Sequence, residues 1–221
     1  MYHPSMDRKA CRIVLADPER PRPAVVEVAL GVLRDGGVVV TPTETLYGLA
    51  VDGRNAEALA RVNRLKGKPE DSPVLLLLGA IEQVGQVAAR VPPLFHPLAE
   101  RFWPGPLTLV VPARPDLPAP ARHDGTVALR LPGLALPRRL ASRLGAPISG
   151  VSANLAGFPA CRRAGDVARV FGDRVDLVLD GGVTPGGTPS TILDLTREPP
   201  RIVREGIVPR AALEPFLPEP R

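Results

Sequence analysis

Lys66 and Lys68 are the most informative side chains in this chain of 221 residues. The sequence contains 28 lysine and arginine residues, and the only lysines are Lys9, Lys66 and Lys68. A lysine carries a compact point charge on a flexible stem, whereas an arginine carries a rigid planar fork. The lysine geometry suits a phosphate cluster that is approached end-on. We therefore favour a phosphate-binding role for the pair over the alternative that a rare residue fell here by chance.

A second group of polar residues, 42–45, follows a predicted buried strand at 38–41. It presents threonine hydroxyls and the carboxylate of Glu44 at a strand's carboxyl end, where open α/β sheets bind ligands. The alternative is a turn that satisfies its own backbone. The residues alone do not separate the two interpretations.

Ser152 and Asn154 follow another apolar strand, predicted at 148–151. Both side chains can form hydrogen bonds with a nucleotide phosphate or sugar. The alternative is a helix N-cap, and the residues alone favour it.

Arg130 lies inside the otherwise apolar segment 127–131. A charge at such a position is costly unless it is paired or faces a cleft. It is suited to binding a substrate carboxylate through two hydrogen bonds, or it belongs to an edge strand and faces solvent. The Gly-rich segment 180–191 ends in two hydroxyls, so it either closes over a ligand or is a surface turn. We interpret 102–106 as core and scaffold.

Apolar segments of strand length alternate with helical patterns, which predicts an α/β domain with a largely buried mixed sheet. Strands are expected at 12–15, 38–41, 74–78, 107–111, 127–131, 148–151, 175–179, 191–195 and 201–204. Helices are expected at 23–34, 55–65, 82–90, 94–102, 136–144 and 165–171. Both site lysines then fall at or just after a helix C-terminus, where Gly67 permits a turn and Pro69 stops the helix.

The composition narrows the function further. The net charge of +5 favours polyanionic partners such as nucleotides or RNA, or else reflects a bias toward arginine. Two cysteines without metal-ligand spacing indicate a cytosolic chain. The sequence has no apolar run of about 18 residues, so we expect no membrane-spanning helix. The N-terminus lacks a signal-peptide pattern. The phosphate-loop, GxGxxG and HExxH motifs are absent, and Gly150 to Asn154 lacks the last glycine of a nucleophile elbow.

Taken together, these segments resemble the YrdC-like family of threonylcarbamoyl-adenylate synthases. The matching motifs are PTETLYGLAVDG (42–53), RLKGKP (64–69), FWPGPLTLVV (102–111), TVALRLP (126–132), SAN followed by Gly157 (152–157), DGG (180–182), STILDL (190–195) and VREG (203–206). The predicted organisation is an N-terminal extension (1–11), a YrdC-like domain (12–208) and a Pro-rich tail (209–221).

The resemblance implies a single-domain twisted mixed sheet with flanking helices and a basic concave face. It implies a cytoplasmic nucleotidyltransferase that converts L-threonine, bicarbonate and ATP, with Mg²⁺, into threonylcarbamoyl-AMP and pyrophosphate. A separate transferase complex then modifies the tRNA adenosine next to the anticodon. Binding of tRNA or double-stranded RNA is a further expected interaction.

The resemblance also assigns site residues. The ATP contacts are expected at Lys66, Lys68, Ser72, Thr126, Ser152, Asn154 and Arg204, with the two lysines stabilising phosphate charge. The L-threonine contacts are expected at Thr45, Arg130, Gly150 and Ser190. No protein nucleophile and no protein-held metal are expected.

The sequence departs from the family pattern at Lys68, Ser72, Leu77, Gly150-Val151 and Ala160, where Arg, Asn, His, Ala-Pro and a small polar residue are usual. Two rival hypotheses follow. One is a non-catalytic paralogue that binds structured RNA. The other is a carbamoyl-adenylate enzyme, which the absence of zinc-finger and acylphosphatase-like segments disfavours.

Overall fold

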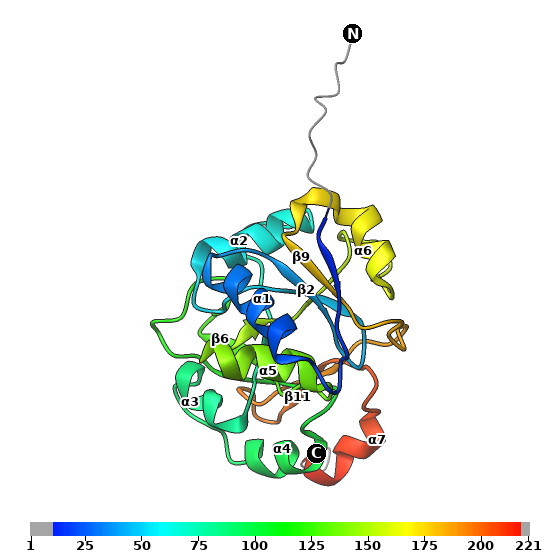
Figure 1. Cartoon of the computed structure of the whole chain (residues 1–221). Helices are drawn as coiled ribbons and strands as arrows, with labels where there is room; N and C mark the ends of the chain where they lie inside the picture. The colour runs from blue at the N-terminus through cyan, green and yellow to red at the C-terminus, as the bar shows by residue number, and fades with distance from the viewer. Residues whose placement is uncertain (1–10, 218–221) are drawn as a thin grey trace.

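The structure, a computed structural model, describes residues 11–217. The predicted extension therefore lies outside the described residues except for Cys11, as do residues 218–221 of the predicted tail. The chain forms two mixed β-sheets flanked by helices (Figure 1). The predicted α/β class with mixed strand pairing is confirmed, and its strands are divided between two sheets.

The first sheet has five strands in the order β1-β9-β2-β3-β8. Its three parallel strands are β1 (Ile13–Leu15), β9 (Leu177–Asp180) and β2 (Val39–Pro42), and its antiparallel additions are β3 (Tyr47–Ala50) and β8 (Val151–Ser152). Every residue of β2 and β3 is buried. Continuous apolar burial is typical of strands that are covered on both faces.

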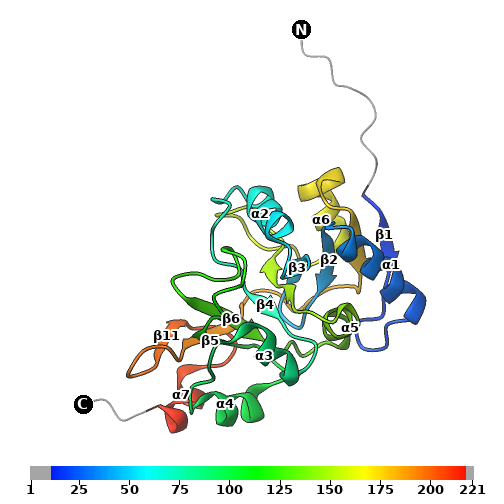
Figure 2. The same cartoon turned by 90° about the vertical axis from the view of Figure 1, so that its left-hand side faces the viewer.

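The second sheet has six strands in the order β11-β10-β5-β6-β4-β7. They are β11 (Arg201–Arg204), β10 (Thr191–Asp194), β5 (Leu107–Pro112), β6 (Thr126–Arg130), β4 (Leu76–Leu77) and β7 (Ile148–Ser149). Figure 2 separates the labelled strands, with β1, β2 and β3 toward the upper right and β5, β6 and β11 toward the lower left.

The chain passes from one sheet to the other at Gly150, so the strand predicted at 148–151 is two short strands, β7 and β8. Ser149 stabilises this corner, because its hydroxyl donates to the Leu49 carbonyl at 2.8 Å and accepts from the Val51 N–H at 3.0 Å. An isolated antiparallel bridge between Asp52 and Ile148 adds a backbone link.

Two helices cover one face of the first sheet, and two others cover the opposite face. The first pair is α1 (Pro23–Arg34) and α5 (Ala135–Leu144), which lie side by side in Figure 1 and bury Leu30 and Leu140 against β2 and β9. The second pair is α2 (Ala56–Leu65) and α6 (Ala164–Phe171). Asn55 caps α2, and its side chain accepts a hydrogen bond from the Ala58 N–H at 3.0 Å.

Shorter helices surround the second sheet. They are a 3₁₀ turn at Ile81–Gln83, then α3 (Val84–Val87) and α4 (Phe95–Phe102). A further 3₁₀ turn, at Gly172–Arg174, directly follows α6 on the first sheet. Trp103 confirms its predicted scaffold role, because it is buried against Phe95 and its indole N–H donates to the Leu107 carbonyl at 2.7 Å.

Residues 209–217 contain a short helix, α7 (Arg210–Leu213), and a 3₁₀ turn at Glu214–Phe216. Leu213 is fully buried in the core, and the Phe216 ring packs edge-on against Phe102. The domain boundaries at 11 and 208 stay predictions. Among residues 11–217, no helix is both long enough and apolar enough to cross a bilayer.

Candidate functional site

A cavity of about 360 Å³ is lined by residues of both sheets and of the segment after α2. It brings together nine of the eleven predicted site residues: Thr45, Lys66, Lys68, Arg130, Gly150, Ser152, Asn154, Ser190 and Arg204. These residues are far apart in the sequence, so the two-sheet arrangement is what places them around one space.

Thr45 lies in the four-residue turn between β2 and β3. The Thr43 hydroxyl donates to the Leu46 carbonyl at 2.8 Å and pairs with the Thr45 hydroxyl at 2.8 Å. Thr43 therefore satisfies the turn's own backbone, and both Thr43 and Thr45 line the cavity. The two sequence interpretations of this segment are compatible, because Thr43 fits both of them.

Arg130 is 3% exposed and lies on β6, between β5 and β4. The alternative of an edge-strand residue facing solvent is therefore wrong. Its Nε donates to the Gly105 carbonyl at 3.1 Å, its Nη1 to the Thr45 hydroxyl at 3.4 Å, and its Nη2 pairs with Glu44. Sequence reasoning noted Glu44 but gave it no role.

Ser190 links Arg204 to Thr108 in the cavity wall through hydrogen bonds. Arg204 donates to the Ser190 carbonyl from Nε at 3.1 Å and from Nη2 at 2.8 Å, and to its hydroxyl at 3.2 Å. The Ser190 hydroxyl also pairs with that of Thr108 at 2.9 Å. Partial desolvation, and then the nearby charge of Arg130, lower the pKa of Arg204. Two guanidinium groups that repel each other make this end of the cavity attractive to an anion.

Thr108 is a cavity residue that sequence reasoning missed. It is fully buried within the predicted strand 107–111. A hydroxyl in an otherwise apolar strand was the available signal, but threonine is also common in strands for its shape alone.

The Lys66 ammonium is buried and faces oxygen atoms of the segment 152–154. It donates to the Ser152 and Asn154 carbonyls, the latter at 3.0 Å, and to Asn154 Oδ1 at 2.8 Å. Burial, and then the charge of Lys68, lower the pKa of Lys66 to about 8. The ammonium therefore organises the Ser152–Asn154 turn. The helix-cap alternative for this turn is wrong, because the next helix starts at Ala164.

Lys68 is exposed at the edge of the same cavity. Within residues 11–217 its side chain makes no hydrogen bond or salt bridge. Gly67, with φ of 70°, occupies the left-handed region and lets the chain leave α2 so that the two lysines take different environments. Of the predicted pair, Lys68 is therefore the ammonium that is available to a phosphate.

Two predicted ATP contacts do not line this cavity. Thr126 lines a neighbouring cavity of about 560 Å³, which shares Pro73, Ala128 and Ile192 with the first one. Ser72 lines neither cavity, and its carbonyl accepts a hydrogen bond from the Asn63 side chain at 2.8 Å. The two cavities are therefore neighbours, separated by the three residues that line both of them.

Gly150 borders the cavity beside Leu77. A Cβ atom at position 150 would lie 2.5 Å from Leu77 Cγ and 2.7 Å from its Cδ2. Glycine is therefore needed for Leu77 to occupy this wall, which makes the wall hydrocarbon at a position where the family pattern has histidine.

The Gly-rich segment after β9 is tied to the cavity wall. The Tyr47 hydroxyl donates to the Gly182 carbonyl at 2.7 Å and accepts from the Gly181 N–H at 3.1 Å. Burial raises the pKa of Tyr47 to about 12, which keeps it a donor. The Gly186 N–H donates to the Thr45 carbonyl at 2.9 Å. The segment thus carries Pro189 and Ser190 to the cavity from a fixed position.

The fold and this cavity define a YrdC-like α/β protein with a cationic site between its two sheets. Residues 31–206 match the Sua5_yciO_yrdC family model, which carries the description "Telomere recombination". The chain belongs to this family, and the predicted resemblance is confirmed.

Similar proteins include threonylcarbamoyl-AMP synthases of Pyrococcus abyssi and Bacillus subtilis. The former is 36% identical over 95% of this chain and 62% of its own length, and the latter is 36% identical over 86% and 55%. The chain thus spans less than two thirds of these relatives.

Two solved structures are similar over most of the chain. P. abyssi Sua5 complexed with L-threonine has a TM-score of 0.88 at 36% identity, covering 95% of this chain and 62% of that one. E. coli YciO has a TM-score of 0.83 at 25% identity, covering 94% and 100%.

Proposed function

We propose that this chain synthesises threonylcarbamoyl-AMP from L-threonine, bicarbonate and ATP, with release of pyrophosphate. The observation that carries the proposal is the convergence of Arg130, Arg204 and Lys68 on one cavity that also presents hydroxyls. Relatives named for this activity and a similar structure that binds L-threonine support it.

The chemistry needs no protein nucleophile. The threonine amine forms a bond to the bicarbonate carbon as water leaves, and the product is a carbamate. A carbamate oxygen then attacks the α-phosphorus of ATP, and the bond to the β-phosphate breaks to release pyrophosphate. What the protein must supply is orientation of two substrates and positive charge where phosphate charge develops.

In this proposal the threonine carboxylate binds Arg130 and Thr45, beside Ser190 and the wall formed by Gly150 and Leu77. A carboxylate beside a buried guanidinium forms a strong, charge-assisted hydrogen bond. The amine then faces the remaining space of the cavity, where bicarbonate enters.

The phosphates of ATP bind Lys68, Arg204 and the Ser152–Asn154 turn, which Lys66 holds from behind. The adenosine extends into the second cavity, over Ala128 and Ile192 toward Thr126. In this proposal Ser72 does not contact ATP directly, and it contributes only by positioning its neighbour Pro73, which lines both cavities.

ATP enters as its magnesium complex. Among residues 11–217 there is no group of three or more His, Cys, Asp or Glu side chains suited to a metal ion. In this proposal the phosphate oxygens and water hold most of the ion's coordination positions, as is common for Mg²⁺ bound with nucleotides.

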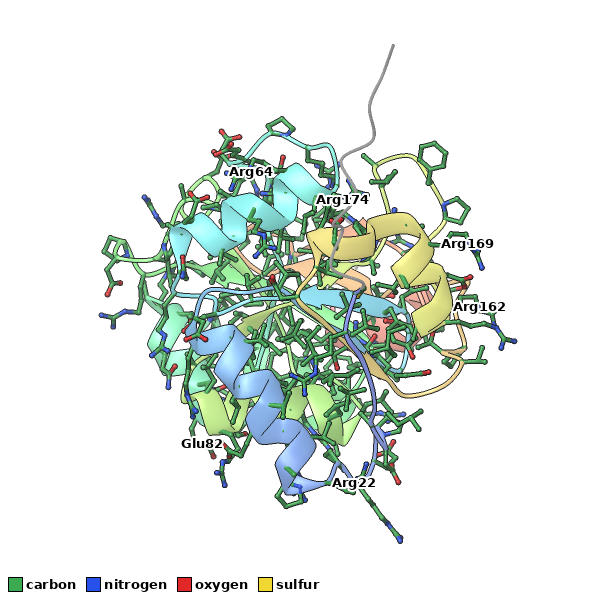
Figure 3. All side chains as sticks on the ribbon, turned by 45° about the horizontal axis from the view of Figure 1, so that its top comes forward. Arg22, Arg64, Glu82, Arg162, Arg169 and Arg174 are labelled. Carbon is green, nitrogen blue, oxygen red and sulfur yellow. The ribbon has the colours of Figure 1, made fainter. Side chains whose placement is uncertain are left out.

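The product serves modification of the tRNA adenosine next to the anticodon by a separate transferase complex, in the cytoplasm. Direct tRNA binding would require unpaired positive charge on the surface. Many surface arginines are paired with carboxylates, for example Arg61 with Asp176 at 2.8 Å and Arg169 with Asp166 at 3.2 Å. Figure 3 shows Arg64 on α2 and Arg169 on α6, on different helices. Such pairing leaves less free charge for an RNA backbone.

The test is pyrophosphate release measured with each substrate omitted in turn. The proposal expects release only when L-threonine, bicarbonate and magnesium-ATP are all present. Release that does not depend on threonine contradicts it. Absence of turnover together with steeply salt-dependent binding of structured RNA would favour the rival, non-catalytic hypothesis.

A further inference from the structure

We propose that Glu44 is a positioning residue for Arg130, which it holds so that a single guanidinium nitrogen, Nη1, is presented to the substrate carboxylate. This inference rests on the proposed function and adds a specificity-determining residue to it. It also replaces the expectation that Arg130 binds the carboxylate through two parallel hydrogen bonds.

The first observation is how the hydrogen-bonding nitrogens of Arg130 are used. Nε donates to the Gly105 carbonyl at 3.1 Å, and Nη2 pairs with Glu44 Oε1. Neither Gly105 nor Glu44 lines the cavity, whereas Arg130 and Thr45 both do. The remaining nitrogen, Nη1, is the one directed to the Thr45 hydroxyl, at 3.4 Å. The guanidinium edge that usually grips a carboxylate is therefore occupied by the protein.

The second observation is that Glu44 has no other side-chain partner among residues 11–217. Its second oxygen, Oε2, is buried and forms no hydrogen bond. The Glu44 side chain is 20% exposed and that of Arg130 is 4% exposed. A buried carboxylate with one partner depends on that partner for compensation of its charge. Among residues 11–217, the ion pair with Arg130 is therefore the interaction that compensates the charge of Glu44.

The third observation is that the chain leaves room for Glu44. A Cβ atom at position 133 would lie 3.2 Å from Glu44 Cδ and 3.3 Å from its Cγ. Gly133 lies three residues after the end of β6, so the segment that follows Arg130 packs against Glu44. An added methyl group there displaces Glu44 by a few tenths of an ångström and leaves its charge intact.

The consequence concerns recognition of the amino acid. One Arg130 nitrogen and the Thr45 hydroxyl form a carboxylate site whose geometry is set by Glu44. When Glu44 becomes neutral, the guanidinium loses its ion-pair anchor and can rotate. The threonine carboxylate then meets a less ordered donor, while the phosphate site at Lys68 and Ser152 is unaffected.

The experiment compares Glu44→Gln, Gly133→Ala and Glu57→Gln in the full chain. Glu57 is an exposed residue paired with Arg64, so Glu57→Gln is the matched control for loss of a Glu–Arg pair outside the cavity. L-threonine binding by calorimetry and the KM values for threonine and ATP are measured for each. Thermal unfolding confirms that each variant is folded.

The proposal expects Glu44→Gln to raise the threonine KM and Kd about tenfold, with the ATP KM changed less than about twofold. Gly133→Ala should shift the same constants in the same direction by a smaller factor. Glu57→Gln should match the wild type. In an Arg130→Ala background, Glu44→Gln should add no further loss of threonine binding, because Glu44 acts through Arg130.

Equal rises in the KM values for both substrates would overturn this inference and leave the proposed function standing. An unchanged threonine Kd in both Glu44→Gln and Gly133→Ala would do the same. So would a full additional loss in the Arg130→Ala background. If wild-type protein does not bind L-threonine, the proposed function fails, and this inference falls with it.

Discussion

Replacement of Lys66 by methionine tests whether burial of the Lys66 ammonium beside the cavity destabilises the folded chain. The change keeps an unbranched side chain and removes the charge. Lys66 is 3% exposed, and burial, followed by the charge of Lys68, lowers its pKa from 10.5 to about 8. Because the folded chain releases this proton at a lower pH than the unfolded chain, the free energy of unfolding should rise with pH between about 8 and 10.5.

The size of the effect follows from the two pKa values. The difference between 10.5 and about 8, at about 1.4 kcal/mol for each pKa unit, is roughly 3 kcal/mol. At pH 7 the folded protein bears this cost, and above pH 10.5 the cost is gone. Lys66→Met has no such group, so wild type should gain roughly 3 kcal/mol of unfolding free energy relative to the variant over this range.

The assay is urea unfolding of wild type and Lys66→Met at several pH values from 7 to 10.5. Other titrating groups are common to both proteins and cancel in the difference. Lys68→Met is the matched control, because Lys68 is exposed and should leave most of the rise in place. A difference between wild type and Lys66→Met that stays constant within about 0.5 kcal/mol would refute the argument.

Three further substitutions address the ligand contacts. Lys68→Met should raise the KM for ATP about tenfold or more, because the exposed Lys68 ammonium is the one available to phosphate. L-threonine binding, measured by calorimetry, should change by less than about twofold. An unchanged ATP KM would show that the phosphates bind elsewhere. Arg130→Ala should mainly raise the threonine requirement in the pyrophosphate assay, and a selective loss of ATP affinity would argue against the assignment. Gly150→Ala should weaken threonine binding because the new methyl group meets Leu77 at 2.5 Å; wild-type affinity in this variant would mean that the amino acid does not contact that wall.

Much of the secondary structure could be predicted because its signals are local. Helix α1 begins at Pro23 and ends at Arg34 as expected, since proline at the first turn and two following glycines mark both ends. The Asn55 cap of α2 was equally clear. Strand β3 was missed because the hairpin turn at 43–46 carries threonines and a glutamate in place of the usual Gly or Asn signal.

The division into two sheets could not be predicted from strand patterns. It depends on Gly150, where the chain changes sheets, and on the Ser149 hydroxyl, which bonds backbone about 100 residues away. Periodicity reports which residues are buried and does not report which sheet buries them. The helix α7 was hidden by the prolines around it, although Leu213 packs in the core.

The convergence of nine of the eleven predicted residues on one cavity could be anticipated from motifs, but the environment of each cation could not. Lys66 and Lys68 look equivalent in sequence and both line the cavity, but the turn at Gly67 leaves Lys66 buried and Lys68 exposed. Arg130 was expected to use its fork on a ligand, yet that edge is paired with Glu44 and Gly105. Such partners are set by tertiary packing, which a single sequence does not encode locally.

The central claim is that one cavity holds an amino acid carboxylate at Arg130 and a nucleotide triphosphate at Lys68. The most direct measurement is a crystal structure with L-threonine and a non-hydrolysable ATP analogue bound together. We expect the carboxylate within hydrogen-bond distance of Arg130 Nη1 and the Thr45 hydroxyl, and phosphate oxygens at Lys68 and Ser152. Threonine and nucleotide bound in separate hollows, or a carboxylate that contacts neither Arg130 nor Thr45, would contradict the account.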